Sequence, residues 1–193
     1  MQTVSQSFFA ETIVKRSKFL SYLVPIADFE TLHSRLRKEH PKANHIVTAY
    51  RRFNEHRQIV EHSSDDGEPK GCAGVPTLNV LRGNDLVECA ILTVRYFGGI
   101  KLGTGGMVRA YTQAASSVID CANLKHWVMK ERYHIGCAYS ALNRLECLIN
   151  ELDIEVLHRD FPGYEVRLKL SADPGSYAML LKKANGLLLK EMF

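Results

Sequence analysis

Apolar residues recur along the chain at two spacings, one helical and one alternating, and together they predict a mixed α/β (α+β) protein. Two strand-like runs rich in Val, Ile, Phe and Leu occupy residues 7–26. Phe29, Leu32 and Leu36 then follow at helical spacing, which predicts a helix that begins at Asp28 and ends before Pro41.

The middle of the chain centres on one apolar strand. Residues 87–97 show too little alternation for a half-exposed strand, so we expect both of its faces to be covered. A glycine-rich turn at 98–106 leads into a helix over 104–122. From its spacing, the buried face of that helix should contain Val108, Tyr111, Ala115, Val118 and Ala122. Two shorter strands and a helix precede the apolar strand, at 45–50, 58–61 and 72–81.

The last third has the order strand, helix, strand, strand, helix, strand, which is the ferredoxin-like βαββαβ arrangement. Residues 164–170 alternate apolar and charged side chains, as a strand with one wet face should. Asp173 and Pro174 predict the start of the last helix, and residues 187–193 the final strand. We therefore expect two domains, residues 1–124 and 125–193, with a junction near residues 123–127.

Composition and charge narrow the class of protein. Of the 193 residues, 46% are hydrophobic and 24% are charged, which excludes a disordered or fibrous chain. No apolar run approaches the ~20 residues that cross a bilayer, and residues 1–9 lack a signal-peptide pattern. The five cysteines have no repeating spacing, so we expect a cytoplasmic protein with reduced thiols and no membrane partner. The formal charge of +4 permits an anionic partner but does not require one.

The glycine-rich turn is the first candidate for chemistry. A turn that feeds a helix N-terminus presents free N–H groups to an anion, and glycines allow close approach to the backbone. The turn matches neither the phosphate-binding loop of nucleotide hydrolases nor the dinucleotide fingerprint. It is either an anion contact or a tight turn that lets a helix lie close to the sheet. The residues concerned are Lys101, Gly103, Thr104, Gly105, Gly106 and Arg109.

The acidic loop at 63–72 is the second candidate. Asp65, Asp66 and Glu68 could hold a hard cation such as Mg²⁺, although their spacing is not that of a calcium loop. The favoured interpretation is structural: Asp-Gly and Glu-Pro are turn sequences, and Asp65 or Asp66 would pair with a buried cation. Arg95, at the end of the apolar strand, is the expected partner.

Catalytic and metal sites have weak support in the sequence. Cys72 lies at a predicted helix start downstream of His62, but a cysteine between glycine and alanine is more often a packing residue. The eight histidines form no zinc pattern. We expect no catalytic residue, no metal and no cofactor.

Basic residues gather in the first domain, above all at Lys15, Arg16 and Lys18. Such a cluster either neutralises phosphate or is an ordinary solvated face.

Three segments in this order resemble the signature of the IMPACT/YigZ family: residues 15–19 (KRSKF), 64–69 (SDDGEP) and 94–103 (VRYFGGIKLG). The resemblance covers essentially the whole chain. It implies a first domain like domain 2 of ribosomal protein S5 and a ferredoxin-like second domain like those of translocating elongation factors. Related eukaryotic proteins bind a ribosome-associated activator and restrain the kinase that senses amino-acid starvation. They do so with an additional N-terminal RWD module, for which we expect no room here.

We therefore expect a non-enzymatic regulator of translation that contacts RNA or the ribosome, or a protein partner in translation control, through its first domain. Lys15, Arg16, Lys18, Lys101 and Arg109 would neutralise phosphate, and the turn at 103–106 would present backbone donors. The alternative is an enzyme or a sensor of a small anion or nucleotide. It would use the turn at 98–106 together with the loop of Asp65, Asp66 and Glu68.

Overall fold

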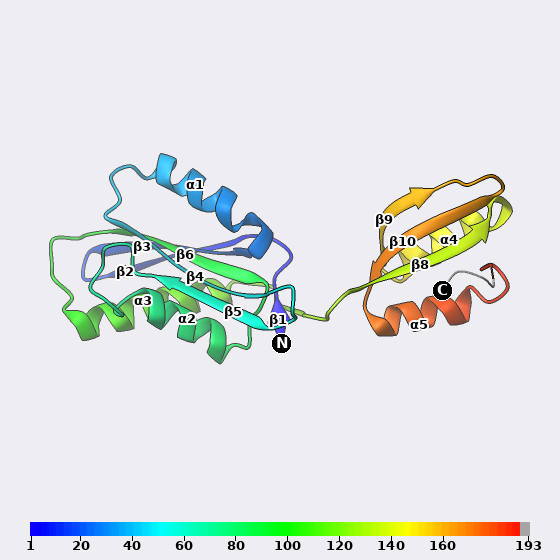
Figure 1. The fold of residues 1–193 in the computed structure, drawn as a ribbon. Helices are drawn as coiled ribbons and strands as arrows, with labels where there is room; N and C mark the ends of the chain where they lie inside the picture. The colour runs from blue at the N-terminus through cyan, green and yellow to red at the C-terminus, as the bar shows by residue number, and fades with distance from the viewer. Residues whose placement is uncertain (190–193) are drawn as a thin grey trace. The chain divides into compact units, whose positions relative to one another are not determined.

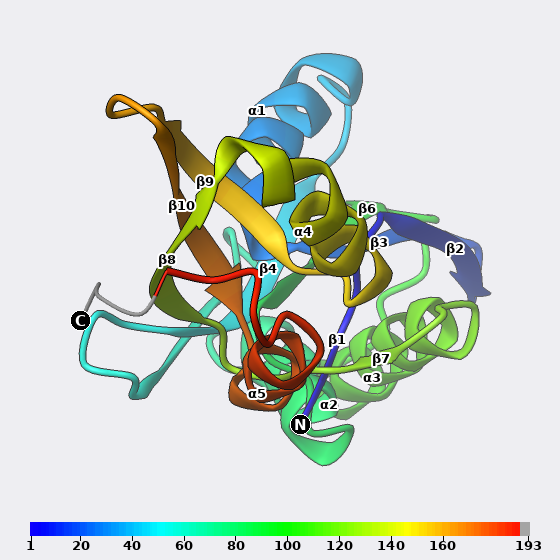
Figure 2. The same cartoon turned by 90° about the vertical axis from the view of Figure 1, so that its right-hand side faces the viewer.

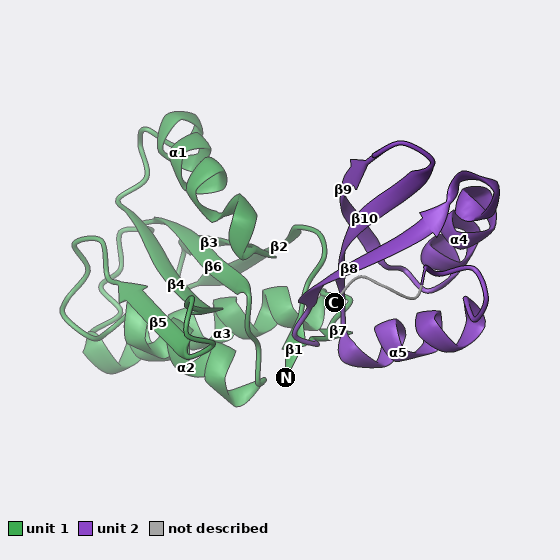
Figure 3. Cartoon of the chain, turned by 45° about the vertical axis from the view of Figure 1, so that its right-hand side comes forward, with its two compact units in different colours: residues 1–127 green, residues 128–193 purple. Residues whose placement is uncertain are grey.

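The computed structural model describes residues 1–189, which form two compact units (Figure 1, Figure 3). Unit 1 comprises residues 1–127, and unit 2 begins at residue 128. The predicted junction, residues 123–127, ends where unit 2 begins. Helices and antiparallel strands occur in both units, so the mixed α/β class is confirmed.

Unit 1 is built on a five-stranded antiparallel sheet with helices on both faces (Figure 1). Helix α1 (Phe29–Glu39), preceded by the 3₁₀ turn η1 (Ile26–Asp28), covers one face, and α2 (Gly74–Gly83) and α3 (Thr104–Asp120) cover the other. The strands, in their order across the sheet, are β2 (Phe8–Val14), β3 (Ser17–Pro25), β6 (Cys89–Tyr96), β4 (His45–Phe53) and β5 (Ile59–Ser64). A two-stranded ribbon joins β1 (Gln2–Thr3) to β7 (Lys125–His126).

Strand β6 lies at the centre of this sheet, and its alternate residues enter two separate cores. Ile91 packs with Leu81 of α2 and Ala115 of α3, whereas Leu92 packs with Leu36 of α1. Both side chains are fully buried, so the prediction that this strand is covered on both faces is confirmed. The same alternation directs Arg95 toward α2 and α3, because it lies an even number of residues from Ile91.

The predicted buried face of α3 is partly wrong. Val108 is 37% exposed, and Met107 is buried in its place. Gly103, with a φ of 71°, reverses the chain immediately before the helix and so determines which residues of the first turn face the sheet. From the second turn onward the prediction holds for Tyr111, Ala115 and Val118, and Ala122 packs against the same core.

Unit 2 has the element order β8 (Glu131–Ala138), α4 (Tyr139–Glu151), β9 (Glu155–Asp160), β10 (Glu165–Ala172) and α5 (Pro174–Lys183). Its antiparallel sheet has the order β8-β10-β9, and both helices pack on one face of it (Figure 2). Asp173 begins α5 as predicted, because its carboxylate accepts the amide N–H groups of Gly175 and Ser176.

The predicted final strand of unit 2 is only partly within the described residues. Over residues 187–189 it makes one isolated antiparallel bridge, between Leu188 and Cys137 of β8, and residues 190–193 lie outside the described part. The elements up to Lys183 follow the ferredoxin-like order.

The central strand should dominate the stability of unit 1. Replacing Ile91, which is fully buried, with alanine is expected to lower the free energy of unfolding by about 2–5 kcal/mol, because a cavity remains in the core. Urea unfolding can be followed by the fluorescence of Trp127, which stacks on Phe53 at a centroid distance of 4.4 Å. The matched control is Ile59→Ala, at a side chain that is 39% exposed. Equal losses in the two variants would contradict this account of the core.

Candidate functional site

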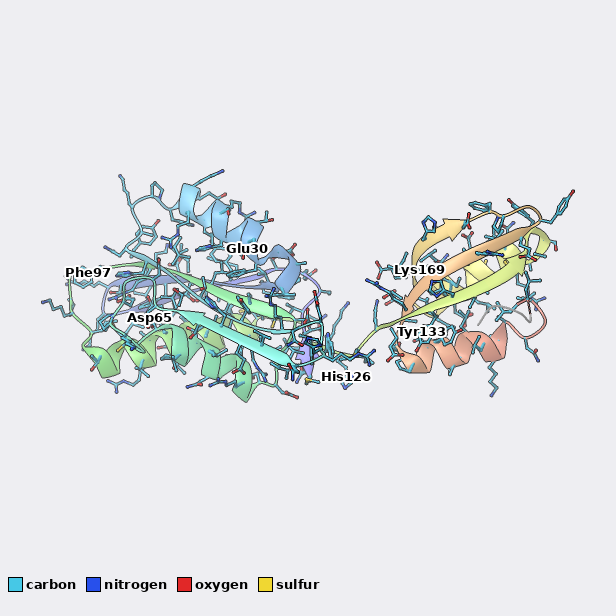
Figure 4. All side chains as sticks on the ribbon, in the orientation of Figure 1. Glu30, Asp65, Phe97, His126, Tyr133 and Lys169 are labelled. Atoms are coloured by element: carbon cyan, nitrogen blue, oxygen red, sulfur yellow. The ribbon has the colours of Figure 1, made fainter. Side chains whose placement is uncertain are left out.

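The three segments singled out in the sequence meet at one end of unit 1. The loops that follow β2, α1, β5 and β6 all lie there (Figure 1). Figure 4 labels Asp65 and Phe97 at this end and His126 at the opposite end of unit 1. The basic turn, the acidic loop and the glycine-rich turn therefore form one surface, although they are far apart in the sequence.

A buried polar cluster lies beneath these loops. The Arg95 Nη1 donates to Glu68 Oε1 at 2.5 Å, and the Tyr111 hydroxyl donates to the same oxygen at 2.8 Å. The side chains of Glu68 and Arg95 are 3% and 6% exposed, so their charges are almost entirely removed from water. Burial, together with the charge and hydrogen bond of Glu68, raises the pKa of Tyr111, which keeps this hydroxyl protonated as a donor. The cluster ties the acidic loop to β6 and α3.

Arg95 is also enclosed by two aromatic rings. Its guanidinium carbon lies 5.6 Å from the centre of the Phe19 ring and 5.9 Å from that of Phe97. A cation over the face of an aromatic ring is attracted by the ring quadrupole. Phe19 is buried, whereas Phe97 is 47% exposed and forms part of the surface above the cluster. The arginine thus connects the core to the surface loop.

The expected pairing of Arg95 with Asp65 or Asp66 is wrong, because Arg95 pairs with Glu68. Asp65 instead accepts three backbone N–H groups, from Gly71, Ala73 and Gly74, at 2.8–3.0 Å. These amides lie at the start of α2, where a helix has no internal acceptors for them. Burial acts to raise the pKa of Asp65, but the three hydrogen bonds outweigh it and hold the pKa below its ordinary value.

Asp66 fixes the acidic loop to α1 and β4. Its carboxylate accepts a hydrogen bond from Arg37 at 2.5 Å and from the Ile46 amide at 2.6 Å. Its carbonyl oxygen lies 2.7 Å from the Nδ1 of His45. Asp66 therefore does pair with a cation, as expected of one of the two aspartates, but that cation is Arg37.

The glycine-rich turn rests directly on the basic turn between β2 and β3. Lys15 and Arg16 have positive φ values of 45° and 68°, which is the backbone of a tight two-residue hairpin turn. A Cβ atom at Gly98 would lie 2.0 Å from the backbone carbon of Arg16, so only glycine fits there. The Gly98 amide donates to the Ser17 hydroxyl at 3.2 Å, and the Phe97 amide donates to Asn44 at 3.0 Å.

The start of α3 presents free backbone donors. Gly103 gives no side-chain cap to this helix, and the first backbone bond runs from the Met107 amide to the Gly103 carbonyl. Within residues 1–189, the preceding amides of Thr104, Gly105 and Gly106 have no acceptor. The partial positive charge of a helix N-terminus therefore faces solvent at this turn.

The predicted basic residues differ in how far their charge is already compensated. Lys15, Arg16, Lys101 and Arg109 are exposed and have no ion pair among the described residues. Lys18 is different: its ammonium lies 2.8 Å from Glu11, on the neighbouring strand. The surface at this end of unit 1 therefore carries four cations that a ligand could neutralise.

The carboxylates of the acidic loop all bind other groups of the protein. Asp65 holds amides, Asp66 holds Arg37, and Glu68 holds Arg95 and Tyr111. No group of three or more metal-ligating side chains occurs among the residues that the structure describes. The predicted residues Asp65, Asp66, Glu68 and Arg95 are thus brought together as a support for the surface loops.

Sequence reasoning missed three residues of this support: Arg37, Asn44 and His45. Arg37 lies on a helix whose other basic residues face solvent, and nothing in its spacing distinguishes it. The His45 Nε2 lies 3.7 Å from Glu68, a contact that depends on the pairing of β4 with β6. Each of these residues is far from its partner in the sequence, so only the folded chain reveals the contacts.

Residues 15–119 match the sequence model of the Impact N-terminal domain. A protein of Haemophilus influenzae described as an IMPACT family member is 33% identical over 154 residues, which are 78% of this chain and 75% of that protein. The chain belongs to the IMPACT family. The resemblance noted in the sequence is thereby confirmed, and every residue of the candidate site lies within the matched segment.

Two further comparisons extend along the chain. An IMPACT family member of Thermus thermophilus is 40% identical over 167 residues, covering 84% of this chain and 88% of its own. A crystal structure described as that of a hypothetical protein superimposes with a TM-score of 0.67 at 27% identity, covering 99% of this chain and 98% of the other. The family likeness therefore includes both units.

Breaking the Glu68–Arg95 pair should markedly lower the free energy of unfolding. We expect Glu68→Gln to lower the free energy of unfolding by about 3–5 kcal/mol, because it leaves a buried guanidinium without a counter-charge. The matched control is Glu11→Gln, which removes the exposed partner of Lys18 and is expected to cost less than about 1 kcal/mol. Urea unfolding of both variants measures the difference, and similar losses would show that the buried pair has no special role.

Asp65 should make stability depend on pH. Its folded pKa is lowered, so its contribution is present at neutral pH and is lost as the pH falls through that folded pKa. We expect Asp65→Asn to cost about 1–3 kcal/mol at pH 7, because an amide cannot accept all three N–H groups. The difference in the free energy of unfolding between the wild type and this variant should narrow as the pH falls below about 4. A gap that stays constant from neutral to acidic pH would contradict this assignment.

Proposed function

We propose that unit 1 binds RNA, free or within the ribosome, and that the protein acts as a non-enzymatic regulator of translation in the cytoplasm. The observation that carries this proposal is the contact between Gly98 and Arg16, which places the basic turn against the glycine-rich turn. Membership of the IMPACT family supports the link to translation control. A protein partner in that process remains compatible with the same surface.

The geometry suits phosphate better than a catalytic reaction. The turn offers exposed cations at Lys15, Arg16, Lys101 and Arg109, together with the free amides at the start of α3. Both kinds of group bind phosphate oxygens without reading the base sequence. The contact to RNA is therefore a backbone contact, and Phe97 adds an exposed ring on which a base can stack.

The alternative, an enzyme or an anion sensor with a bound cation, has less support. It requires Asp65, Asp66 and Glu68 to face a ligand. All three carboxylates are engaged with amides, Arg37 or Arg95, and Glu68 is 3% exposed. A cation at this loop would have to displace those partners. No helix within residues 1–189 is both long and apolar enough to cross a membrane, and we propose no membrane contact.

Co-sedimentation with ribosomes, and with naked RNA, over a series of salt concentrations tests the proposal. Binding should weaken as salt rises, because each phosphate contact releases counterions. We expect Lys15→Glu combined with Arg16→Glu, and separately Lys101→Glu, to weaken binding and to lower the slope of log Kd against log salt by at least about 0.7 per residue.

The matched control is Lys125→Glu, an exposed lysine on β7 beside His126, at the opposite end of unit 1 (Figure 4). It makes the same change in charge and should leave binding nearly unchanged. No binding by the wild type at low salt would overturn the proposed function. Equal losses in the control and in Lys101→Glu would overturn the proposed site.

A further inference from the structure

One face of the unit 2 sheet carries no helix. Both α4 and α5 pack on the other face, against Val166, Leu168 and Leu170 of β10. The residues between them on β10, Arg167 and Lys169, therefore point to the open face. An antiparallel sheet with one uncovered face presents a surface of alternating polar side chains that is available to a partner.

Strand register collects nitrogen-bearing side chains on this face. Lys169 lies between His134 of β8 and His158 of β9, so these three side chains form a row across the sheet. Arg132 lies on the same face two residues before His134. None of these four has an ion pair among the described residues. They form what we call the basic row.

Carboxylates lie at both ends of the same face. Arg167 is opposite Asp160 in the strand register and lies 4.0 Å from Glu165, so two carboxylates are near its charge. Glu155 is opposite Ser171, whose partner on the other side is Arg132 of the basic row. Lys169 and Arg132 are the cations of this face that have no ion pair among the described residues.

The face is hollowed rather than flat. A pocket of about 800 Å³ is lined on the open face by the basic row, Asp160 and Arg167, and on the helix-covered side by Tyr133, Ile135, Leu168 and Tyr177. Tyr133 is opposite Leu170, so its stack with Tyr177 of α5, with ring centres 3.6 Å apart, lies on the helix-covered side of the sheet. Figure 4 labels Tyr133 and Lys169 on the two sides of the β8–β10 pair. Cations on the open face beside a hollow suit a ligand that carries phosphate groups.

We propose that this face of unit 2 is a second binding surface, for single-stranded RNA. Lys169 and Arg132 contact phosphate oxygens, and the imidazoles of His134 and His158 donate N–H groups to the backbone or stack on a base. The inference goes beyond the proposed function, which places RNA on unit 1.

Fluorescence anisotropy with the full chain tests this surface. The probe is a fluorescein-labelled oligouridylate of about 12 nucleotides, at about 50 mM salt. We expect Lys169→Glu to weaken binding about tenfold and to lower the salt slope by at least about 0.7. Lys169→Ala should weaken binding less, and circular dichroism establishes that both variants are folded.

The matched control is Lys182→Glu, an exposed lysine on α5, the helix that packs on the opposite face of the sheet. It should leave affinity unchanged. If Lys182→Glu and Lys169→Glu weaken binding equally, the surface assignment is overturned. The double histidine variant His134→Ala with His158→Ala should weaken binding several-fold without changing the melting temperature.

The failure of this proposal is distinguishable from that of the proposed function. If only Lys169→Glu weakens binding, unit 2 binds RNA and the unit 1 site is wrong. If only the Lys15 and Arg16 reversal weakens it, the unit 2 surface is overturned. Two further results would also overturn it: uridine monophosphate that displaces the oligonucleotide at equal affinity, which indicates a small-molecule pocket, or an acidic peptide that binds in place of RNA.

Discussion

The buried ion pair between Glu68 and Arg95 is the constraint on which the surface loops at one end of unit 1 depend. Two charges removed from water are tolerated only when each satisfies the other at close range. Glu68 belongs to the loop before α2, Arg95 ends β6, and Tyr111 of α3 donates to the same carboxylate. This ion pair therefore holds the loop before α2, β6 and α3 together, and with them the acidic loop and the glycine-rich turn at the surface.

The two units display positive charge by different physical means. In unit 1 three of the four cations, Lys15, Arg16 and Lys101, stand on turns and Arg109 stands on α3, so their positions depend on glycine and on a buried support. In unit 2 they stand on three neighbouring strands, β8, β10 and β9, where alternation along each strand selects the open face. The first arrangement is locally strained and specific, whereas the second requires only that the strands keep their register.

Local patterns predicted most of the elements and few of the contacts. The double burial of β6, the cap at Asp173 and the order of elements in unit 2 follow from spacing and turn residues, which are local properties. The partner of Arg95 could not be predicted in this way. Three carboxylates in four residues look alike in sequence, and the loop backbone decides that Glu68, not Asp65 or Asp66, turns inward. The prediction that Val108 is buried was wrong for a related reason, because the turn at Gly103 sets the rotation of α3 about its axis.

The contact at Gly98 also couples two segments that lie far apart in the sequence. Gly98 bonds to Ser17, 81 residues earlier, and its Cα approaches the backbone of Arg16 so closely that no side chain fits. A lineage that lengthened the hairpin turn would remove the surface on which the glycine-rich turn rests. A lineage that replaced this glycine would displace the hairpin. The two segments are consequently coupled in the fold, because a change in the length of one or in the glycine of the other has to be accommodated by its partner.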